Sequence, residues 1–208
     1  MLNCTDDKLA GLIGSRICHD LISPIGAVTN GLELMELAGL PRGPEADLVN
    51  QSAQSAAARI KYYRLAFGDT GPLDAGHTVS GEEISGILRG VFLSDRIAVN
   101  WQILDDVFRA EAKAILLMLM CAEAALGSGG QIDVTRQENA FIIEAEGPKL
   151  MLQSAPWGML QGEAAACADT EIAIAPAAVQ FAILPEVLRQ LGRRLVISSN
   201  DAALTMRI

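Results

Sequence analysis

Two long helical patterns, separated by a short glycine- and proline-rich turn, constrain the fold of this chain more than any other feature. At about 100° of rotation per residue, the apolar residues of the first pattern gather on one side of a helix that runs from Thr5 or Asp6 to about Ala38. These residues are Leu9, Ile13, Ile17, Leu21, Val28, Leu32 and Met35. The turn at residues 39–44 ends in Pro44, which suits the first turn of a second helix, predicted over residues 45–67.

The second helix also carries an apolar stripe, with small residues in its middle that permit a close approach between helices. Its members are Leu48, Ser52, Ala56, Ile60, Tyr63 and Phe67. Two helices cannot bury both stripes alone, whereas four can, so we infer a homodimer in which two hairpins form a four-helix bundle. The alternative is a single hairpin that packs against the second domain of its own chain.

The rest of the chain, from about His77 to Ile208, has the helix and strand patterns of an α+β domain. Helices are predicted over 82–92, 109–126 and 177–191, and strands over 97–103, 131–136, 141–146, 195–198 and 204–208, with turns at 137–139 and 200–201. Residues 149–176 show no clear periodicity, and we place no element there. The sequence thus predicts a helical hairpin over 1–72 and a mixed domain over 77–208.

Composition and charge exclude several classes of protein. Half of the 208 residues are hydrophobic but only 4% are aromatic, so we expect an aliphatic core. The net charge of −9 argues against nucleic acid or an anionic membrane as a partner. We expect no signal sequence, because residues 4–7 are polar, and no membrane span, because the longest apolar stretch, 114–122, is far shorter than roughly 18 residues. With two histidines and no CxxC pairing, we expect no metal site and free thiols in a reducing cytoplasm.

His19 faces away from the apolar stripe of the first helix. The residues on its own face, most of them small or polar, are Leu12, Ser15, Arg16, Ile22, Ser23 and Gly26. Small neighbours leave the imidazole approachable, and a histidine presented to solvent from a rigid helix can carry a phosphoryl group between partners. From position alone, the alternative is an ordinary solvated histidine. Pro24 costs roughly 3 kcal/mol in a helix interior, which points to a function or to a structural kink.

The motif His-acid-Leu-x-(Ser/Thr)-Pro, which begins at His19, resembles the phospho-acceptor motif of histidine kinase dimerisation domains. Residues 114–122 are similar to the ATP-binding helix of histidine kinase catalytic domains, and residues 178–199 to their closing helix and strand. The nucleotide chemistry is missing, because Met118 and Ala122 stand where the kinases carry metal-binding asparagines. Residues 144–148 and 175–178 contain prolines and lack the glycine-rich loops that supply N–H donors to phosphates. We therefore expect no ATP hydrolysis and no autophosphorylation.

A kinase-like hairpin joined to a kinase-like domain without nucleotide chemistry is typical of dimeric histidine phosphotransferases. Over nearly its whole length the chain resembles the alphaproteobacterial ChpT family of these proteins, most specifically in residues 15–27 and 59–68 and weakly in residues 149–176. The resemblance implies a degenerate, ATP-binding-like α/β domain behind the hairpin. It also implies a multistep phosphorelay in which a receiver of a hybrid sensor kinase phosphorylates His19. His19 then passes the phosphoryl group to response regulators that control the cell cycle or motility.

Within such a relay, His19 is the nucleophile and Asp20 accepts a hydrogen bond from its Nδ1–H, while Arg16 offsets phosphate charge. The alternatives are a solvated carboxylate for Asp20 and an ion pair with the receiver surface for Arg16. Magnesium is expected from the receiver, so no cofactor is expected here. The expected first contacts of a docking receiver are Leu12, Ser15, Ile22, Ser23 and Gly26.

Three other functions are compatible with parts of the sequence. The chain could bind receivers without accepting phosphate, or act as a receiver phosphatase in which Ser23 and the nearby polar face position water. It could also be a sensor kinase that has lost its sensor, although the missing nucleotide loop argues against this. The second histidine, His77, is interpreted as structural.

Overall fold

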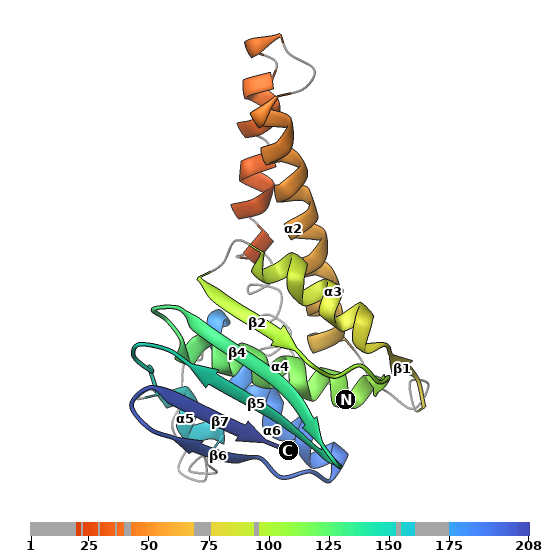
Figure 1. The fold of residues 1–208 in the computed structure, drawn as a ribbon, viewed down its shortest axis with the longest axis vertical. Coiled ribbons are helices and arrows are strands. Elements are labelled where there is room, and N and C mark those ends of the chain that lie inside the picture. The colour runs from red at the N-terminus through yellow and green to blue at the C-terminus, as the bar shows by residue number, and fades with distance from the viewer. Residues whose placement is uncertain are drawn as a thin grey trace, which may run out of the picture.

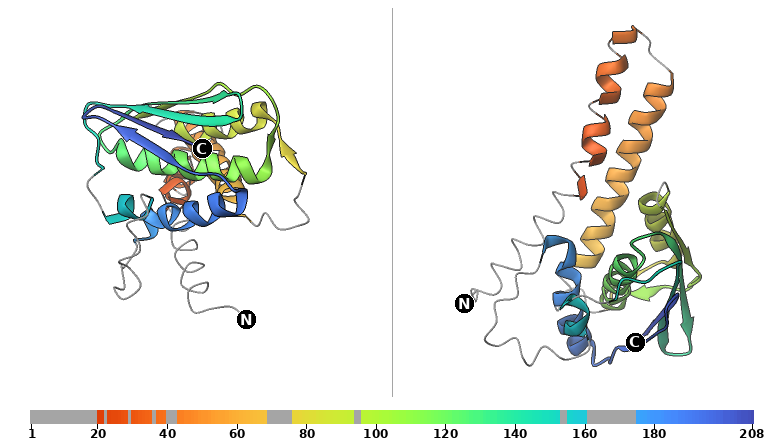
Figure 2. Two further views of the ribbon diagram at one scale, coloured as in Figure 1. Left: turned by 90° about the horizontal axis from the view of Figure 1, so that it is seen from below. Right: turned by 90° about the vertical axis from the view of Figure 1, so that its left-hand side faces the viewer.

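The computed structural model describes residues 20–21, 23–28, 30–35, 37–39, 43–68, 76–93, 96–152, 155–160 and 175–208. Helical residues 20–21, 23–28, 30–35 and 37–38, hereafter the N-terminal segments, lie along helix α2 (Pro44–Phe67) and run antiparallel to it (Figures 1 and 2). This pair of helices rises from a domain in which helices cover one face of a β-sheet. The predicted mixture of a helical hairpin and an α/β layer is confirmed.

Helix α2 begins and ends where its sequence favours it. Pro44 occupies the start, Glu45 lies in the first turn and Arg64 in the last, so both charges complement the helix dipole. The backbone N–H of Gly68 caps the end by donating to the Arg64 carbonyl at 3.1 Å. Gly31 of the N-terminal segments lies against α2 so closely that a Cβ atom there would overlap the Val49 side chain. This glycine therefore sets the close approach of the two helices.

A five-stranded sheet forms the base of the molecule, in the order β2-β4-β5-β7-β6. Strands β2 (Ile97–Trp101) and β4 (Gly130–Gln137) are parallel, and the other neighbours are antiparallel. The remaining strands of the sheet are β5 (Ala140–Glu146), β7 (Ala203–Arg207) and β6 (Val196–Ser199). A separate pair is formed by β1 (Thr78–Val79) and β3 (Val107–Phe108).

Residues alternate between the two faces of the sheet, as the strand period of two requires. Ile132, Ala145 and Leu204 pair across β4, β5 and β7 and are buried. In the adjacent row, Asp133 pairs with Glu144, and Glu144 with Thr205. The first row packs toward the helices, and the second is polar and reaches solvent.

Helix α4 (Arg109–Ala125) lies between the sheet and helix α6 (Val179–Leu191), and the base of α2 packs on it (Figure 2). Every residue from Ala114 to Cys121 is at most 2% exposed. A helix that is apolar all round must be buried on all sides, and this arrangement supplies a partner for each side. Helix α4 is therefore the centre of the core.

Ser80 is the N-cap of helix α3 (Gly81–Phe92), and its side chain accepts a hydrogen bond from the Glu83 N–H at 3.1 Å. At the other end of the domain, Gly192 ends α6 in the left-handed conformation, with φ of 63°. Glycine adopts this conformation without the steric cost that a Cβ atom would bring. The short helix α5 (Ala155–Leu160) and the turn η3 (Pro176–Ala178) complete the described elements.

The predicted elements of the mixed domain are confirmed, with shifts of one or two residues at their ends. The predicted strand 97–103 ends earlier, at Trp101. The predicted helix 177–191 begins as the 3₁₀ turn η3. The start of the first helix and the predicted domain boundary at 72–77 fall mostly outside the described residues, so both stay predictions.

Candidate functional site

A groove of about 400 Å³ lies between the N-terminal segments and α2. We call it the interhelix groove. The N-terminal segments contribute Asp20, Ser23, Pro24 and Ala27, and α2 contributes Leu48, Gln51, Ser52, Ser55 and Arg59. Six of the nine lining residues are polar, and they include a carboxylate and a guanidinium. Such a surface is accessible to a partner protein and is not part of the sealed core.

Asp20, the acidic residue of the predicted phospho-acceptor motif, is tied to α2. The hydroxyl of Tyr63 donates a hydrogen bond to Oδ2 of Asp20. Tyr63 is buried, and its ring packs between Tyr62 and Phe67, with centroid separations of 5.8 Å to each. The carboxylate is therefore held from the opposite helix by a side chain that has little freedom to move.

Three of the predicted site residues are described by the structure. Asp20 and Ser23 both line the interhelix groove. Ser23 and Gly26 are exposed, and open space surrounds the place where a Cβ atom on Gly26 would lie. The other predicted site residues, which lie outside the described residues, are His19, Arg16, Leu12, Ser15 and Ile22. Their roles stay predictions.

Sequence reasoning expects the second helix beside the docking face but does not identify which residues of α2 line the site. Tyr63 was assigned to an apolar stripe, but its hydroxyl bonds to a carboxylate. Ser52 is buried, whereas Leu48 and Ile60 of the same predicted stripe are 42% and 53% exposed. The polar residues Ser52, Ser55 and Arg59 follow one another at helical spacing along the groove, and this spacing was the available signal.

The segments that resemble a nucleotide site carry no phosphate-binding groups in the described structure. Met118 and Ala122 are fully buried in α4, and neither side chain has an oxygen or nitrogen that could hold a cation. Glu144 lies in β5, paired with Asp133 and Thr205, so this part of the sequence is strand and not loop. Pro176 opens η3, where a glycine-rich loop would supply N–H donors.

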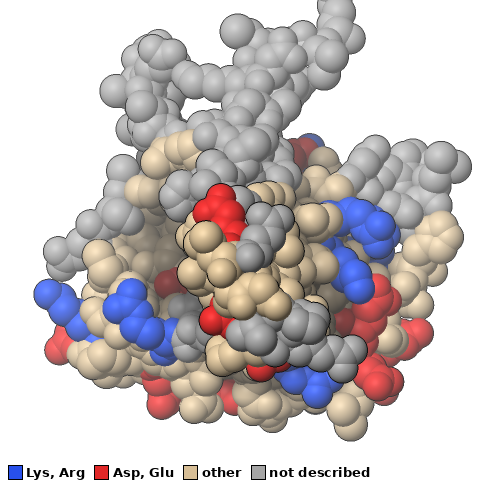
Figure 3. Space-filling model, turned by 90° about the horizontal axis from the view of Figure 1, so that it is seen from above, with Lys and Arg blue, Asp and Glu red and all other residues tan. Residues whose placement is uncertain are grey.

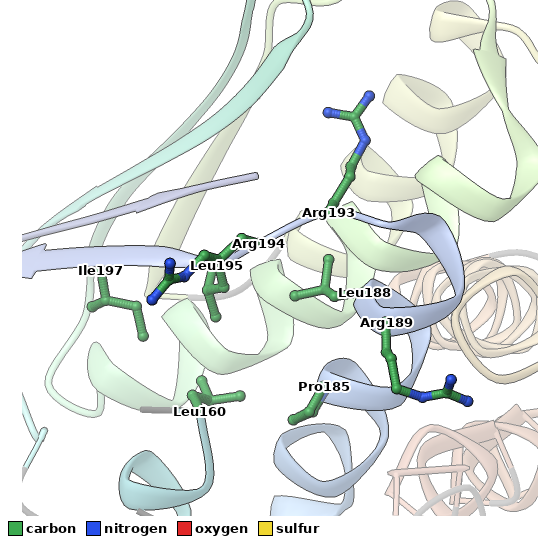
Figure 4. Close-up of a pocket in the computed structure, with 8 residues that line it drawn as sticks. All are labelled: Leu160, Pro185, Leu188, Arg189, Arg193, Arg194, Leu195 and Ile197. Atoms are coloured by element: carbon green, nitrogen blue, oxygen red, sulfur yellow. The ribbon is translucent and has the colours of Figure 1, made fainter. Parts of the chain in front are cut away.

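A second hollow, of about 560 Å³, lies beside α5, α6 and β6 (Figure 4). Three arginines border it, but their side chains diverge. Arg189 binds Glu186 at 2.6 Å, and Arg193 binds Glu111 at 2.5 Å. Ligand sites in proteins usually have polar groups that converge on one point. Among the described residues this hollow has no such convergence, and we assign it no ligand.

Charged groups do not gather into one basic patch on the face seen along the hairpin. In Figure 3, the described Lys and Arg side chains lie in separate groups with acidic side chains among them.

Within the described ranges, no three His, Cys, Asp or Glu side chains are placed to hold a metal ion. No described helix is long and apolar enough to cross a membrane. Burial raises the pKa of the Cys121 thiol well above its usual value, so this cysteine is an inert core residue.

Comparisons with known proteins agree with this architecture. Residues 81–203 match the family described as histidine phosphotransferase C-terminal domain. The protein phosphotransferase ChpT of Brucella abortus (strain 2308) is 33% identical over an alignment of 147 positions, and the match covers 68% of this chain and 69% of that protein. A 1.7 Å structure of a bacterial phosphotransferase matches 100% of this chain and 97% of that chain, with a TM-score of 0.75 and 26% identity.

One further match is much weaker. The histidine kinase domain of the blue-light activated kinase EL346 of Erythrobacter litoralis covers 97% of this chain and 94% of that domain, at 13% identity and a TM-score of 0.41. The family match spans more than half of the chain and the ChpT relative more than two thirds of it. The chain therefore belongs to the ChpT family of histidine phosphotransferases, which act in phosphorelays. Such proteins exchange phosphoryl groups with two-component partners such as receiver domains.

Proposed function

We propose that His19 accepts a phosphoryl group from the aspartyl phosphate of a hybrid kinase's receiver domain and passes it to response regulators of the cell cycle or motility. The observation that carries this proposal is the placement of Asp20, which follows His19 in the sequence. Its carboxylate is held by Tyr63 and lines a groove between the two helices. A positioned carboxylate beside an accessible groove supports phosphoryl transfer to a docked partner at this place.

The proposed reaction moves a phosphoryl group from oxygen to nitrogen and back. Nε2 of neutral His19 attacks the phosphorus, a P–N bond forms, and the P–O bond breaks to release the receiver's aspartate as a carboxylate. The proton on Nδ1 stays on the ring, where Asp20 accepts a hydrogen bond from it and supports the developing positive charge. In the second transfer, an aspartate of the response regulator attacks the same phosphorus and the P–N bond breaks.

The other groups of the reaction are divided between the partners. We assign Arg16 to offset the charge of the phosphoryl group. The receiver is proposed to supply magnesium and a lysine, so this chain would use no cofactor of its own.

A docking receiver is proposed to contact the face around His19 first, through Leu12, Ser15, Ile22, Ser23 and Gly26. The exposure of Ser23 and Gly26 supports this surface, and Gln51 and Ser55 of α2 extend it across the interhelix groove. A protein that passes phosphate between partners must release each of them quickly, so a small and weak interface suits it.

The hairpin is proposed to pair with that of a second copy in a four-helix bundle. Several large apolar side chains of the hairpin are exposed in the single chain, with Leu37 at 85%, Ile60 at 53% and Leu32 at 50%. A second hairpin would remove this surface from water, at about 25 cal/mol for each Å² of apolar area. The exposed apolar residues of the hairpin are Ile25, Leu32, Leu34, Leu37, Leu48 and Ile60.

We also propose that the chain works in the cytoplasm and binds neither ATP nor nucleic acid. The buried, apolar Met118 and Ala122 support the absence of ATP binding, because they leave no ligand for a metal–nucleotide pair. The net charge of −9 opposes binding to a polyanion.

A phosphotransfer assay tests the proposed function. A receiver domain, radiolabelled on its aspartate by its kinase, is mixed with the wild-type chain, with His19→Ala and with Asp20→Asn. We expect base-stable, acid-labile label on the wild type, none on His19→Ala, and slower labelling of Asp20→Asn with receiver binding almost unchanged. Label that stays on the receiver in every sample would favour a binding module. Label lost to free phosphate without reaching the chain would favour a receiver phosphatase.

A further inference from the structure

Tyr63 links the two helices of the hairpin beside the proposed transfer site. Its hydroxyl reaches across the helix pair to Oδ2 of Asp20, which is 43 positions earlier in the chain. Tyr63 is only 3% exposed, whereas Asp20 lines the interhelix groove, so the donor side of this hydrogen bond is shielded from water and the acceptor side is partly open. The bond therefore fixes the Asp20 carboxylate relative to α2.

The position of the Tyr63 hydroxyl depends in turn on the core of the mixed domain. The neighbouring Tyr62 donates to the Leu116 carbonyl of α4 at 3.3 Å. Lys113 of α4 donates to the Gly68 carbonyl at the end of α2, at 2.7 Å. These bonds anchor the C-terminal end of α2, where Tyr63 lies, on α4.

We propose that Tyr63 is a positioning residue for phosphoryl transfer, because its hydroxyl holds the Asp20 carboxylate in the orientation that supports His19. The inference rests on the proposed function, in which Asp20 accepts a hydrogen bond from His19. A donor on one carboxylate oxygen restricts rotation of the carboxylate and leaves the other oxygen to accept the bond from His19. The mixed domain thereby contributes to the reaction by holding α2.

The chain offers a closely matched pair of variants for the test. Tyr63→Phe removes only the hydroxyl that contacts Asp20 and keeps the packed ring. Tyr62→Phe removes a hydroxyl from the adjacent, equally buried tyrosine, whose bond goes to the Leu116 carbonyl instead. In the phosphotransfer assay we expect Tyr63→Phe to slow labelling roughly tenfold, with the receiver Kd unchanged. We expect Tyr62→Phe, in which Lys113 still anchors the end of α2, to label within about twofold of the wild-type rate and to unfold at a lower temperature.

A double-mutant cycle shows whether Tyr63 acts through Asp20. We expect Tyr63→Phe to slow labelling in the wild-type background but to have no further effect in Asp20→Ala. A wild-type rate for Tyr63→Phe would overturn the proposal, as would an equal slowing with and without Asp20. An unlabelled wild-type chain would instead refute the proposed function, and the role of Tyr63 with it. The wild-type sample therefore separates the two failures.

Discussion

Helices α2 and α4 differ in how much of each is buried, and the difference follows the proposed division of the molecule into a transfer surface and a stable base. In α4, 11 of 17 residues are buried, whereas in α2 only 5 of 24 are, four of them within Tyr62–Ala66. The interhelix groove and the exposed Leu48 and Ile60 lie along the sparsely packed part of α2. A surface that binds and releases partners has to remain accessible, while the mixed domain, with the buried α4 at its centre, supplies a packed base.

The largest effect should come from a leucine in the buried helix. Leu117→Ala, at a fully buried position of α4, is expected to lower the free energy of unfolding by about 3–5 kcal/mol, because it leaves a cavity. Lys61→Ala, at an exposed position of the hairpin outside its apolar surface, should change it by less than about 1 kcal/mol. Urea denaturation followed by circular dichroism measures both. Equal losses would contradict the division between a packed base and an open hairpin.

The apolar surface of the hairpin gives the next largest effect. The double variant Leu32→Glu/Ile60→Glu places two charges on the surface proposed to pair with a second copy. We expect dimer affinity to fall roughly hundredfold, or about 2.7 kcal/mol, with the secondary structure intact. Light scattering after size-exclusion chromatography measures the mass. Leu104→Glu, at a 90% exposed position outside the hairpin, is the control. An unchanged mass for the double variant would refute the proposed bundle.

A smaller effect is expected from an ion pair that joins three parts of the base. Arg193 binds Glu111 of α4 at 2.5 Å, donates to the Asn139 carbonyl at 2.7 Å, and lies 5.2 Å from the Phe141 ring. Arg193→Ala should cost about 1–2 kcal/mol of unfolding free energy, since both side chains of the pair are largely shielded from water. In a double-mutant cycle with Glu111→Gln, we expect a coupling of about 1 kcal/mol. Additive losses would mean that the pair is not a stabilising unit.

The two regions also differ in how far their sequence predicts their structure. In the mixed domain, β4, β5 and α6 lie within two residues of their predicted positions, because alternation and helical periodicity are strong there. Strands β1 and β3 have two residues each and therefore no period to detect. Helix α5 falls in the stretch for which periodicity predicted nothing.

The sequence predicts only those residues of the candidate site that are neighbours along the chain. A motif of adjacent residues identified His19 and Asp20 together. The contact between Asp20 and Tyr63 depends on the register of two antiparallel helices, which the connection between them and the close approach at Gly31 determine. Helical periodicity places Tyr63 on a buried face, but it does not say which residue of the facing helix its hydroxyl meets.

The smallest effect concerns a charge pair on the surface of the base. The exposed pair of Glu186 with Arg189, at 2.6 Å, lowers the pKa of Glu186 from 4.5 to about 2 through hydrogen bonds from Arg189 and Gln190. A depressed folded-state pKa stabilises the protein above the unfolded-state value, and this contribution is lost as the pH falls from about 4.5 through about 2. The difference in stability between the wild type and Glu186→Gln should therefore shrink over this range. Because water and salt screen an exposed pair, we expect the difference to be small at pH 7 and to decrease at high ionic strength. Carboxyl NMR titration of Glu186 measures the pKa directly, and a value near 4.5 would show that the pair does not persist in solution.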